Sequence, residues 1–423
     1  MTNAVITILI LAVMLVCYIT KLIPIAATSV LGALAIGFLG IMPMKDVMAQ
    51  FVSDVVLLQI GVMIIGKAFF EVGLADDVGR FLSKHFANRE KIFLIGIVMV
   101  AIMISPFLSN TATVALVIPI IASVEAASGG RLEKKNYYMA VGIASVLGGN
   151  LTLFGSTPQL AVQNLLLESD VAGVHPLGTF ELVKVGLPLA LLLPVFYLTV
   201  GDKLQKRVFD YTTEDKLAVK LDDTAKPLYK KILVLAIYLA CIICFVGQWI
   251  PIGVTAITGA VLCVALRCIS EKNALYGVGW TTVIMLGGIL GFSAGFSKSG
   301  AGQLIVDTVV GLFGQNHSPM LYYVIFVLVA VALTAVMSNT AVAVMLTPIA
   351  ITMAVQTGGN PMTFVFGVLL AANISFCTPM ATAPVTMTMD GGYRFSDFFK
   401  VGGAFTLVAT AYALIAVPLI CGI

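Results

Sequence analysis

Apolar segments long enough to cross a lipid bilayer recur along most of the chain. A transmembrane helix needs about 20 predominantly apolar residues. The segments that approach this length are 4–20, 23–41, 54–73, 137–157, 181–200, 232–249, 251–269, 277–298, 363–385 and 400–420. We expect each of them to form a membrane-spanning helix. The pattern therefore predicts an all-α polytopic membrane protein.

Two further apolar stretches, 91–126 and 318–357, are too long for one span and contain the same polar tripeptide. The two copies are Ser109-Asn110-Thr111 and Ser338-Asn339-Thr340. A broken helix in lipid leaves backbone groups without partners, at a cost of several kcal/mol each, so such breaks favour a functional reason. Each stretch is either a pair of spans or a re-entrant hairpin with the tripeptide at its tip. Both alternatives return the chain to the side from which it came.

The chain reads as two copies of one unit. Matching features recur at an almost constant offset of about 227 residues, which is the signature of an internal repeat. The matches are Pro24-Ile25 with Pro251-Ile252, Gly61 with Gly288, Gly73 with Gly300, Thr152 with Thr378, and the two tripeptides. We expect residues 1–200 and 232–423 to form two inverted repeats, each with five transmembrane helices and one re-entrant helical hairpin. A charged linker, 201–231, would join them. Inverted repeats of this kind place a binding site between the halves, near the middle of the membrane.

Composition and charge agree with a membrane protein and add an orientation. Hydrophobic residues make up 60% of the chain and charged residues 11%, against about 25% charged in soluble domains. If the predicted spans are counted from one side, 20 of the 24 Lys and Arg residues fall on a single side of the membrane, in the loops or in the linker. The exceptions are Lys45, Lys67, Lys184 and Lys298. The positive-inside rule makes that side cytoplasmic. We expect a multi-pass protein of the cytoplasmic (inner) membrane, with the linker inside and both termini outside.

The tripeptides have the chemistry of a ligand site. Asn offers an acceptor and donors, and the Ser and Thr hydroxyls do both. A helix that begins just after the tripeptide directs free N–H groups and a partial positive charge at its tip, which suits an anion. Side-chain and carbonyl oxygens at the same turn also suit Na⁺. The simpler alternative is a helix N-cap, since all three residue types cap well.

A second polar interruption follows in each half, within the predicted spans 137–157 and 363–385. The first contains Gly148 and Gly149 and leads to the turn 155–159, and the second covers 377–384, with two Pro and two Thr. Pro removes a donor and Gly loosens the helix, which frees carbonyl oxygens for a cation. Pro kinks without ligands are the alternative explanation.

Titratable side chains are missing from these polar centres. Proton-coupled and cation-expelling pumps keep a titratable acid within the membrane. A neutral site for an anion instead needs helix dipoles, hydroxyls and bound cations, and this favours Na⁺ coupling. Lys67 and Glu71 stand four residues apart in one span, where an i,i+4 ion pair near the membrane interface is the simpler interpretation and a gating role the alternative.

Other kinds of chemistry have weaker support. Gly291-Phe292-Ser293-Ala294-Gly295 matches the nucleophile elbow of serine hydrolases, but it lies in an apolar helix with no preceding strand and no intramembrane His. An intramembrane hydrolase is therefore unlikely on chemical grounds, and we expect a non-enzyme without catalytic residues. The sequence has no phosphate-binding loop, zinc motif or basic nucleic-acid face, so neither a resident cofactor nor nucleic-acid binding is expected.

The whole chain resembles the divalent anion:sodium symporters of the ion transporter superfamily. The resemblance rests on the twin tripeptides, on the Gly-Gly-x-x-Thr-x-Phe-Gly run 148–155, and on the closing segment 391–402. It implies a homodimer, Na⁺ as coupling ion, and an elevator-type motion that carries the site across the membrane. The family's Thr-Pro-Pro-Asn turns are altered here to Ser156-Thr157-Pro158-Gln159 and Thr382-Ala383-Pro384-Val385. These changes leave the substrate open.

The resemblance also implies roles for individual residues. Substrate contacts would come from Asn110, Thr111, Asn339, Thr340, Ser156, Thr157 and Thr382. One sodium site would use Ser105, Ser109, Asn110 and carbonyls near Gly148. The other would use Thr334, Ser338, Asn339 and carbonyls near Ala381.

The function predicted from the sequence is Na⁺-coupled symport of a small divalent anion, with a C4-dicarboxylate favoured. Small anionic substrate, Na⁺ and membrane lipid are the expected partners. The alternatives are a cation-independent dicarboxylate exchanger, a sulfate or phosphate symporter, and a cation/proton antiporter or arsenite-type permease of the same superfamily.

Overall fold

The computed structural model of the protein describes residues 2–423 except 21, 75–76, 78–89, 128–131, 211–226, 248, 303, 306, 309–317, 336–337 and 379–381. These residues form helices and connecting turns, and no β-strand occurs among them. Apolar helices built from Leu, Ile, Val, Ala and Phe account for most of the fold. The all-α prediction is confirmed.

The helices follow the same order in the two halves of the chain. The first half contains α1 (Asn3–Thr20), α2 (Ile25–Phe38), α3 (Met44–Ala49), η1 (Gln50–Val52), α4 (Asp54–Glu71), α6 (Glu90–Ile104), α7 (Asn110–Ala127), η2 (Lys134–Asn136), α8 (Tyr138–Gly149), α9 (Thr157–Leu167), α10 (Val183–Phe196), η3 (Tyr197–Gly201) and α11 (Asp202–Val208). The second half contains α12 (Leu228–Gly247), α13 (Ile252–Ala265), α14 (Glu271–Gly277), α15 (Trp280–Ser299), α17 (Pro319–Thr334), α18 (Asn339–Thr357), α19 (Pro361–Asn373), α20 (Ala383–Met387), η4 (Thr388–Gly391), α21 (Phe395–Asp397), η5 (Phe398–Gly402) and α22 (Gly403–Cys421).

Five helical stretches among the described residues are long and apolar enough to cross a membrane. They are Met44–Glu71, Val183–Val208, Leu228–Phe245, Asn339–Thr357 and Phe398–Cys421. Shorter apolar helices lie between them. The protein is therefore a multi-pass membrane protein.

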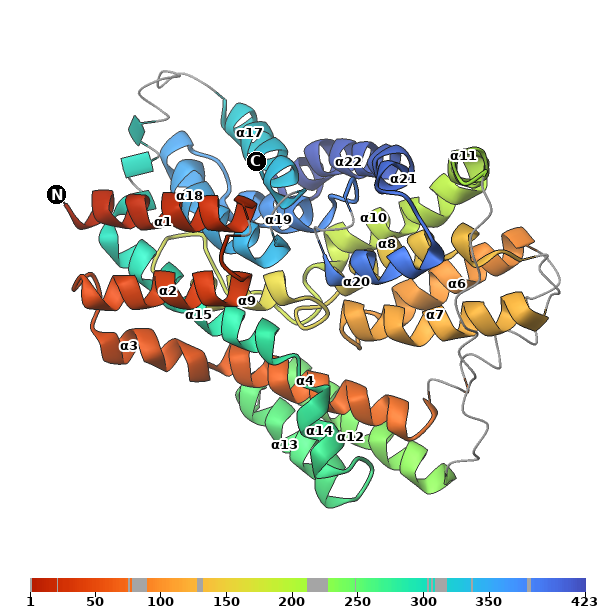
Figure 1. The fold of residues 1–423 in the computed structure, drawn as a ribbon. Helices are drawn as coiled ribbons and strands as arrows, with labels where there is room; N and C mark the ends of the chain where they lie inside the picture. The colour runs from red at the N-terminus through yellow and green to blue at the C-terminus, as the bar shows by residue number, and fades with distance from the viewer. Residues whose placement is uncertain are drawn as a thin grey trace.

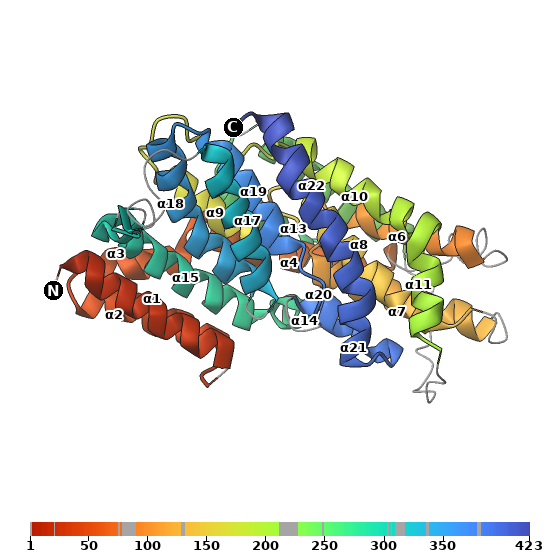
Figure 2. The same cartoon turned by 90° about the horizontal axis from the view of Figure 1, so that it is seen from above.

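The helices pack in two groups, and each group takes helices from both halves of the chain. The first packing group consists of α1–α4 and α12–α15, and the second of α6–α11 and α17–α22. In Figure 1 the first group occupies the left and lower part of the molecule, and the second occupies the top and right. The view from above shows α1, α2 and α15 at the opposite end from α10, α11 and α22 (Figure 2).

Two reciprocal contacts relate the halves within the first packing group. α2 packs against α15, and α13 packs against α4. A Cβ on Gly61 would lie 2.4 Å from the carbonyl carbon of Ala256, and one on Gly288 would lie 2.7 Å from that of Ser29. Gly61 corresponds to Gly288 in the repeat, and Ser29 corresponds to Ala256. Each half therefore places its helix backbone against the same position of the other, as an approximate twofold relation requires.

Each tripeptide lies at the turn of a helical hairpin inside the protein. α6 and α7 form the first hairpin, and α17 and α18 form the second. α6 has 15 residues and therefore extends about 22 Å, which is shorter than the roughly 30 Å of a bilayer core. Both turns open onto one internal cavity. The short α6 suits the hairpin alternative, but α18 is long and apolar enough to cross a membrane, so the choice between a re-entrant hairpin and a pair of spans stays a prediction.

Three predicted boundaries differ in detail from the structure. In the predicted span 137–157 the helix α8 ends at Gly149 and α9 begins only at Thr157, and the predicted span 363–385 ends as α19 at Asn373 before α20 begins at Ala383. The predicted linker begins at residue 201, but the helix continues through η3 and α11 to Val208. Most of that linker, 211–226, lies outside the described residues.

Candidate functional site

A cavity of about 750 Å³ lies between the two packing groups. The first group contributes α4 and the segment that joins α14 to α15. The second contributes the starts of α7, α9, α18 and α20. The lining residues are Gln59, Val62, Met63, Gly66, Lys67, Phe70, Ser109, Asn110, Thr111, Ala112, Ala115, Phe154, Gly155, Ser156, Thr157, Pro158, Gly277, Gly279, Met285, Ser338, Asn339, Thr340, Thr382, Ala383 and Pro384.

All the residues predicted to contact substrate line this one cavity. They are Asn110, Thr111, Ser156, Thr157, Asn339, Thr340 and Thr382. They come from four helix starts that are far apart in the sequence. Ser109 and Ser338, predicted as sodium ligands, also line it. Four helix N-termini around one space provide unpaired N–H groups and partial positive charge, which stabilise an anion.

The Ser of each tripeptide caps the helix that follows. Ser109 Oγ accepts a hydrogen bond from the Ala112 amide at 3.2 Å, and Ser338 Oγ accepts one from the Ala341 amide at 3.2 Å. These bonds fix the point at which α7 and α18 begin. The capping alternative is therefore realised by Ser, while the following Asn and Thr are left for other contacts.

Four oxygen-rich groups meet behind the first tripeptide. One terminal atom of the Asn110 amide lies 2.9 Å from Ser105 Oγ, 2.9 Å from the Ser145 carbonyl oxygen and 3.1 Å from the Gly155 carbonyl oxygen. Ser105 Oγ is also 2.6 Å from the Ser145 carbonyl oxygen. Amide nitrogen at this position donates to these oxygens. If the amide oxygen occupied this position instead, it would face three other oxygens, and the Ser105 hydroxyl would supply the one hydrogen among them. Such a cluster of oxygens suits a cation.

The second tripeptide has the same arrangement with a fixed amide. Thr334 Oγ1 lies 2.7 Å from Asn339 Oδ1 and 2.8 Å from the Ala372 carbonyl oxygen, again two acceptors for one hydroxyl hydrogen. Asn339 Nδ2 donates to Asn373 Oδ1 at 3.0 Å, so its oxygen points toward Thr334. Sequence reasoning did not identify Asn373, which has no polar counterpart in the first half.

The irregular turns after α8 and α19 form equivalent hydrogen bonds to the two hairpins. Thr152 Oγ1 donates to the Pro106 carbonyl at 2.6 Å, and Thr378 Oγ1 donates to the Ala335 carbonyl at 2.7 Å. Gly148 packs on the first hairpin, since a Cβ there would lie 2.6 Å from the Ile102 carbonyl oxygen. It borders the oxygen cluster, but the nearest carbonyl ligands are those of Ser145 and Gly155. Ala381, predicted near the second sodium site, lies outside the described residues.

Lys67 is the one charged side chain among the described residues that line the cavity. The predicted ion pair with Glu71 is wrong, because the Glu71 carboxylate instead accepts a hydrogen bond from Asn273 Nδ2. The Lys67 stem passes close to Gly277, where a Cβ would lie 2.8 Å from Lys67 Cγ. The i,i+4 spacing was a misleading signal, since a partner on α14 could not be foreseen from it.

The two packing groups also meet at the other end of α4. Gln50 Nε2 donates to Glu168 Oε1 at 3.1 Å, and Asn164 Nδ2 donates to Gln50 Oε1 at 3.0 Å. Gln50 precedes α4, whereas Lys67 lies one turn before its end. The groups are thus hydrogen-bonded near the start of α4. They are also hydrogen-bonded near its end, beside the cavity, where Tyr238 of α12 packs on Phe69 and its hydroxyl donates to the Phe107 carbonyl oxygen at 2.5 Å.

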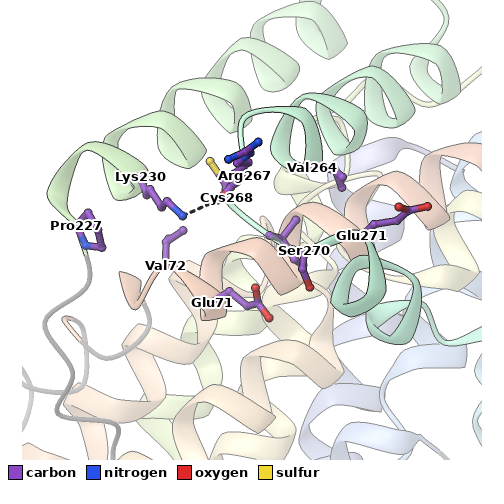
Figure 3. Close-up of a pocket in the computed structure, with 10 residues that line it drawn as sticks. Glu71, Val72, Pro227, Lys230, Val264, Arg267, Cys268, Ser270 and Glu271 are labelled. Atoms are coloured by element: carbon purple, nitrogen blue, oxygen red, sulfur yellow. Dashed lines mark hydrogen bonds between the residues drawn. The ribbon is translucent and has the colours of Figure 1, made fainter.

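A second hollow, of about 500 Å³, lies where the ends of α4, α12 and α13 meet α14. Figure 3 shows Glu71 and Glu271 on its walls together with Lys230 and Arg267. Lys230 Nζ donates to the Arg267 carbonyl oxygen at 2.6 Å. This hollow contains none of the predicted site residues. Its two carboxylates are balanced by two cations, so its charge gives no preference for an anion, and the cavity between the packing groups is the better candidate because it gathers the predicted residues.

Neither a serine nucleophile at Ser293 nor a resident metal site finds geometric support in the described part of the chain. Ser293 Oγ is buried and has no hydrogen-bond partner there, so no His activates it as a nucleophile. No group of three or more His, Cys, Asp or Glu that could hold a metal ion occurs among the described residues. The oxygen clusters at the tripeptides are built from neutral groups, as expected for a weakly held alkali cation rather than a resident transition metal.

The fold and cavity define a class of protein: a multi-pass membrane protein with a polar site between two helix groups, as in secondary transporters. The family model described as "Citrate transporter" matches residues 10–364 and 242–422. The chain belongs to this citrate transporter family.

Individual relatives are also transporters by name. The sodium-dependent dicarboxylate transporter SdcS of Staphylococcus aureus is 24% identical over 96% of this chain and 84% of its own length. The uncharacterized transporter YfbS of Escherichia coli is 33% identical over 172 residues, which are 40% of this chain and 28% of that protein. The YdaH transporter of Alcanivorax borkumensis has a similar fold, with a TM-score of 0.56 and 12% identity over 88% of this chain and 86% of that one.

Proposed function

We propose that the protein is a secondary active transporter that carries a small divalent anion, preferentially a C4-dicarboxylate, together with Na⁺. This proposal rests on one observation: residues of both tripeptides and of the two turns 155–159 and 377–384 (the Thr/Pro turns) line one cavity. Asn110, Thr111, Asn339 and Thr340 would hold the two carboxylates from opposite sides. Ser156, Thr157 and Thr382 would complete the contacts from the two turns.

The coupling cations would bind behind the tripeptides. Ser105, Ser109, Asn110 and the carbonyls of Ser145 and Gly155 would hold one Na⁺, with Gly148 at its edge. Thr334, Ser338, Asn339, the Ala372 carbonyl and carbonyls near Ala381 would hold the other. Each Asn would then contact a cation on one side and substrate on the other. Substrate and Na⁺ bind together in this scheme because the cation orients the amide and supplies positive charge beside the carboxylate.

The position of the cavity favours an opening toward one side of the membrane. The cavity lies near the end of α4, the Gln50–Asn164–Glu168 hydrogen bonds join the groups near its start, and the Tyr238–Phe107 hydrogen bond joins them beside the cavity. By the positive-inside rule the end of α4 is cytoplasmic, so this arrangement would be inward-open. Transport then requires the second packing group to move against the first, as in an elevator, with release of these hydrogen bonds.

The remaining parts of the proposal follow the sequence and the family resemblance. The protein would reside in the inner membrane as a homodimer, with the 201–231 linker in the cytoplasm and both termini outside. No resident cofactor is proposed. The relative SdcS is named for sodium-dependent dicarboxylate transport and is similar over nearly the whole chain, which supports substrate and coupling ion.

Uptake into proteoliposomes tests the proposal. An inward Na⁺ gradient should drive accumulation of labelled succinate, and an equal K⁺ gradient should not. Excess citrate, malate, sulfate and phosphate should be added as competitors, citrate above all because the family is described by it.

The alternatives give different results in the same vesicles. Na⁺-independent exchange against internal succinate would establish the exchanger. Uptake of sulfate or phosphate in place of succinate would establish the inorganic-anion symporter. Cation movement driven by a pH gradient alone would establish the antiporter and refute the proposal.

A further inference from the structure

One positive charge stands in the cavity without a partner. Lys67 lies on α4, one turn before its end, and its exposed side chain lines this cavity. No carboxylate among the described residues forms an ion pair with it, and Glu71, one turn further on, is held by Asn273. Every other described lining residue is neutral. The cavity therefore carries a net positive charge, whereas the tripeptides and turns alone would make it neutral.

The charge is specific to the first half of the chain. The position that corresponds to Lys67 in the second repeat is Ala294, which is 4% exposed. Lys67 also belongs to the first packing group, whereas the tripeptides and both Thr/Pro turns belong to the second. Its ammonium thus approaches a bound anion from the wall that faces all the other predicted contacts.

The neighbouring backbone makes room for this side chain. Gly277, at the end of α14, lies so close to the Lys67 stem that a Cβ there would be 2.8 Å from Cγ and 2.9 Å from Cβ of Lys67. Any larger residue would push the stem aside. An ammonium on a flexible stem attracts anions through water and can also form a charge-assisted hydrogen bond with a carboxylate.

We propose that Lys67 is a substrate-selecting residue, which recruits the anion into the open cavity and favours dianions over monoanions. This inference rests on the proposed function and deepens it. The tripeptides would bind carboxylates through dipoles, hydroxyls and amides, whereas Lys67 supplies the one full positive charge among the described residues that line the cavity. Because it sits on the opposite packing group, the contact would be made in the open state and lost when the groups slide past each other.

Substitution of Lys67 tests the inference. Lys67→Gln should raise the KM for succinate about tenfold, as expected for loss of a charge-assisted hydrogen bond, with little change in kcat. Lys67→Arg should restore most of the affinity. The KM for monomethyl succinate, a monoanion, should change much less. The wild-type KM for succinate should rise with ionic strength more steeply than that of Lys67→Gln, since the screened charge is absent in the variant.

Lys272→Gln is the matched control. Lys272 lies on α14, near Gly277, but it does not line the cavity, and its ammonium is 5.9 Å from the Tyr276 ring centroid. The control should transport succinate like the wild type. Gly277→Ala keeps the lysine but crowds its stem, and should raise the KM in the same direction as Lys67→Gln. Thermal stabilisation of each variant by Na⁺ shows that the protein is folded.

Three outcomes would overturn the inference: an unchanged KM in Lys67→Gln, an equal increase in Lys272→Gln, or a fall in kcat alone. The proposed function fails separately, if wild-type protein shows no Na⁺-driven succinate uptake. In that case a thermal-shift panel identifies an anion that stabilises the wild type. The dissociation constant of that anion is then measured in place of the KM. Lys67→Gln should weaken that binding about tenfold, and equal binding would again reject the role of Lys67.

Discussion

The two hairpin turns have the same plan, but they hold their asparagines differently. Ser105 and Thr334 occupy equivalent places, and each hydroxyl faces an Asn amide and a carbonyl of the helix that comes after the hairpin, α8 or α19. In the second half Asn373 fixes the Asn339 amide through a hydrogen bond. In the first half Val146 stands at the corresponding position, and the Asn110 amide is surrounded by oxygens. The proposed second cation site would thus be preformed, whereas the proposed first site would need a cation to turn the Asn110 oxygen inward.

The largest effect is expected from removing either asparagine. Asn110→Ala or Asn339→Ala should lower Na⁺-driven succinate uptake by more than about 100-fold, because each change removes a cation ligand and a substrate contact together. Uptake in proteoliposomes measures this, with gel filtration as a control for folding. Normal uptake in both variants would refute the site.

Removing the hydroxyls should separate cation binding from substrate binding. Thr334→Ala and Ser105→Ala should each raise the Na⁺ concentration for half-maximal uptake about tenfold, since one oxygen ligand is lost. Thr334→Ser keeps the hydroxyl and should behave like the wild type. If Thr334→Ser were as impaired as Thr334→Ala, the methyl group would matter rather than the oxygen, and the cation site would be wrong.

The reciprocal glycine contacts should be equally sensitive in the two halves. Gly61→Ala and Gly288→Ala each force a Cβ against backbone, and should cost about 1–3 kcal/mol of stability. Gly37→Ala is the control, because its Cβ would come closer than 3 Å only to the flexible Met44 side chain and would be in ordinary contact, 3.5 Å, with the Met44 backbone. Thermal unfolding in detergent measures all three. A destabilised control alongside a stable Gly288→Ala would contradict the approximate twofold packing.

The smallest effect tests the difference between the turns most closely. Asn373→Val gives the second half the residue found in the first, and it frees the Asn339 amide without removing any cation ligand. The Na⁺ affinity should fall by roughly threefold, as expected for a neutral hydrogen bond worth about 0.5–1.5 kcal/mol. Isothermal titration with Na⁺ measures it. An unchanged Na⁺ affinity would show that the Asn339 amide does not need the hydrogen bond to Asn373.

Much of this arrangement could be predicted from the sequence. Hydrophobic runs indicated the helices, and the shared offset of Gly61 and Gly288 indicated a repeat whose matching contacts the structure contains. The residues predicted to contact substrate meet at one cavity because hairpin turns and helix breaks are polar exceptions in an apolar chain. Asn373 was missed, and Lys67 was assigned to an ion pair with Glu71, for the opposite reason. Their roles depend on neighbours in other helices, Asn273 and Gly277 for the lysine and Asn339 for the amide, and no local spacing encodes those contacts.

The central claim is that both halves of the chain bind one anion, which lies between the two tripeptides. An experimental structure with Na⁺ and bromosuccinate, whose bromine gives an anomalous signal, tests it most directly. The account predicts a bromine peak in the cavity between Asn110–Thr111 and Asn339–Thr340, with a cation behind each tripeptide. A peak elsewhere, such as the hollow lined by Glu71 and Arg267, or contacts from only one half, would contradict it.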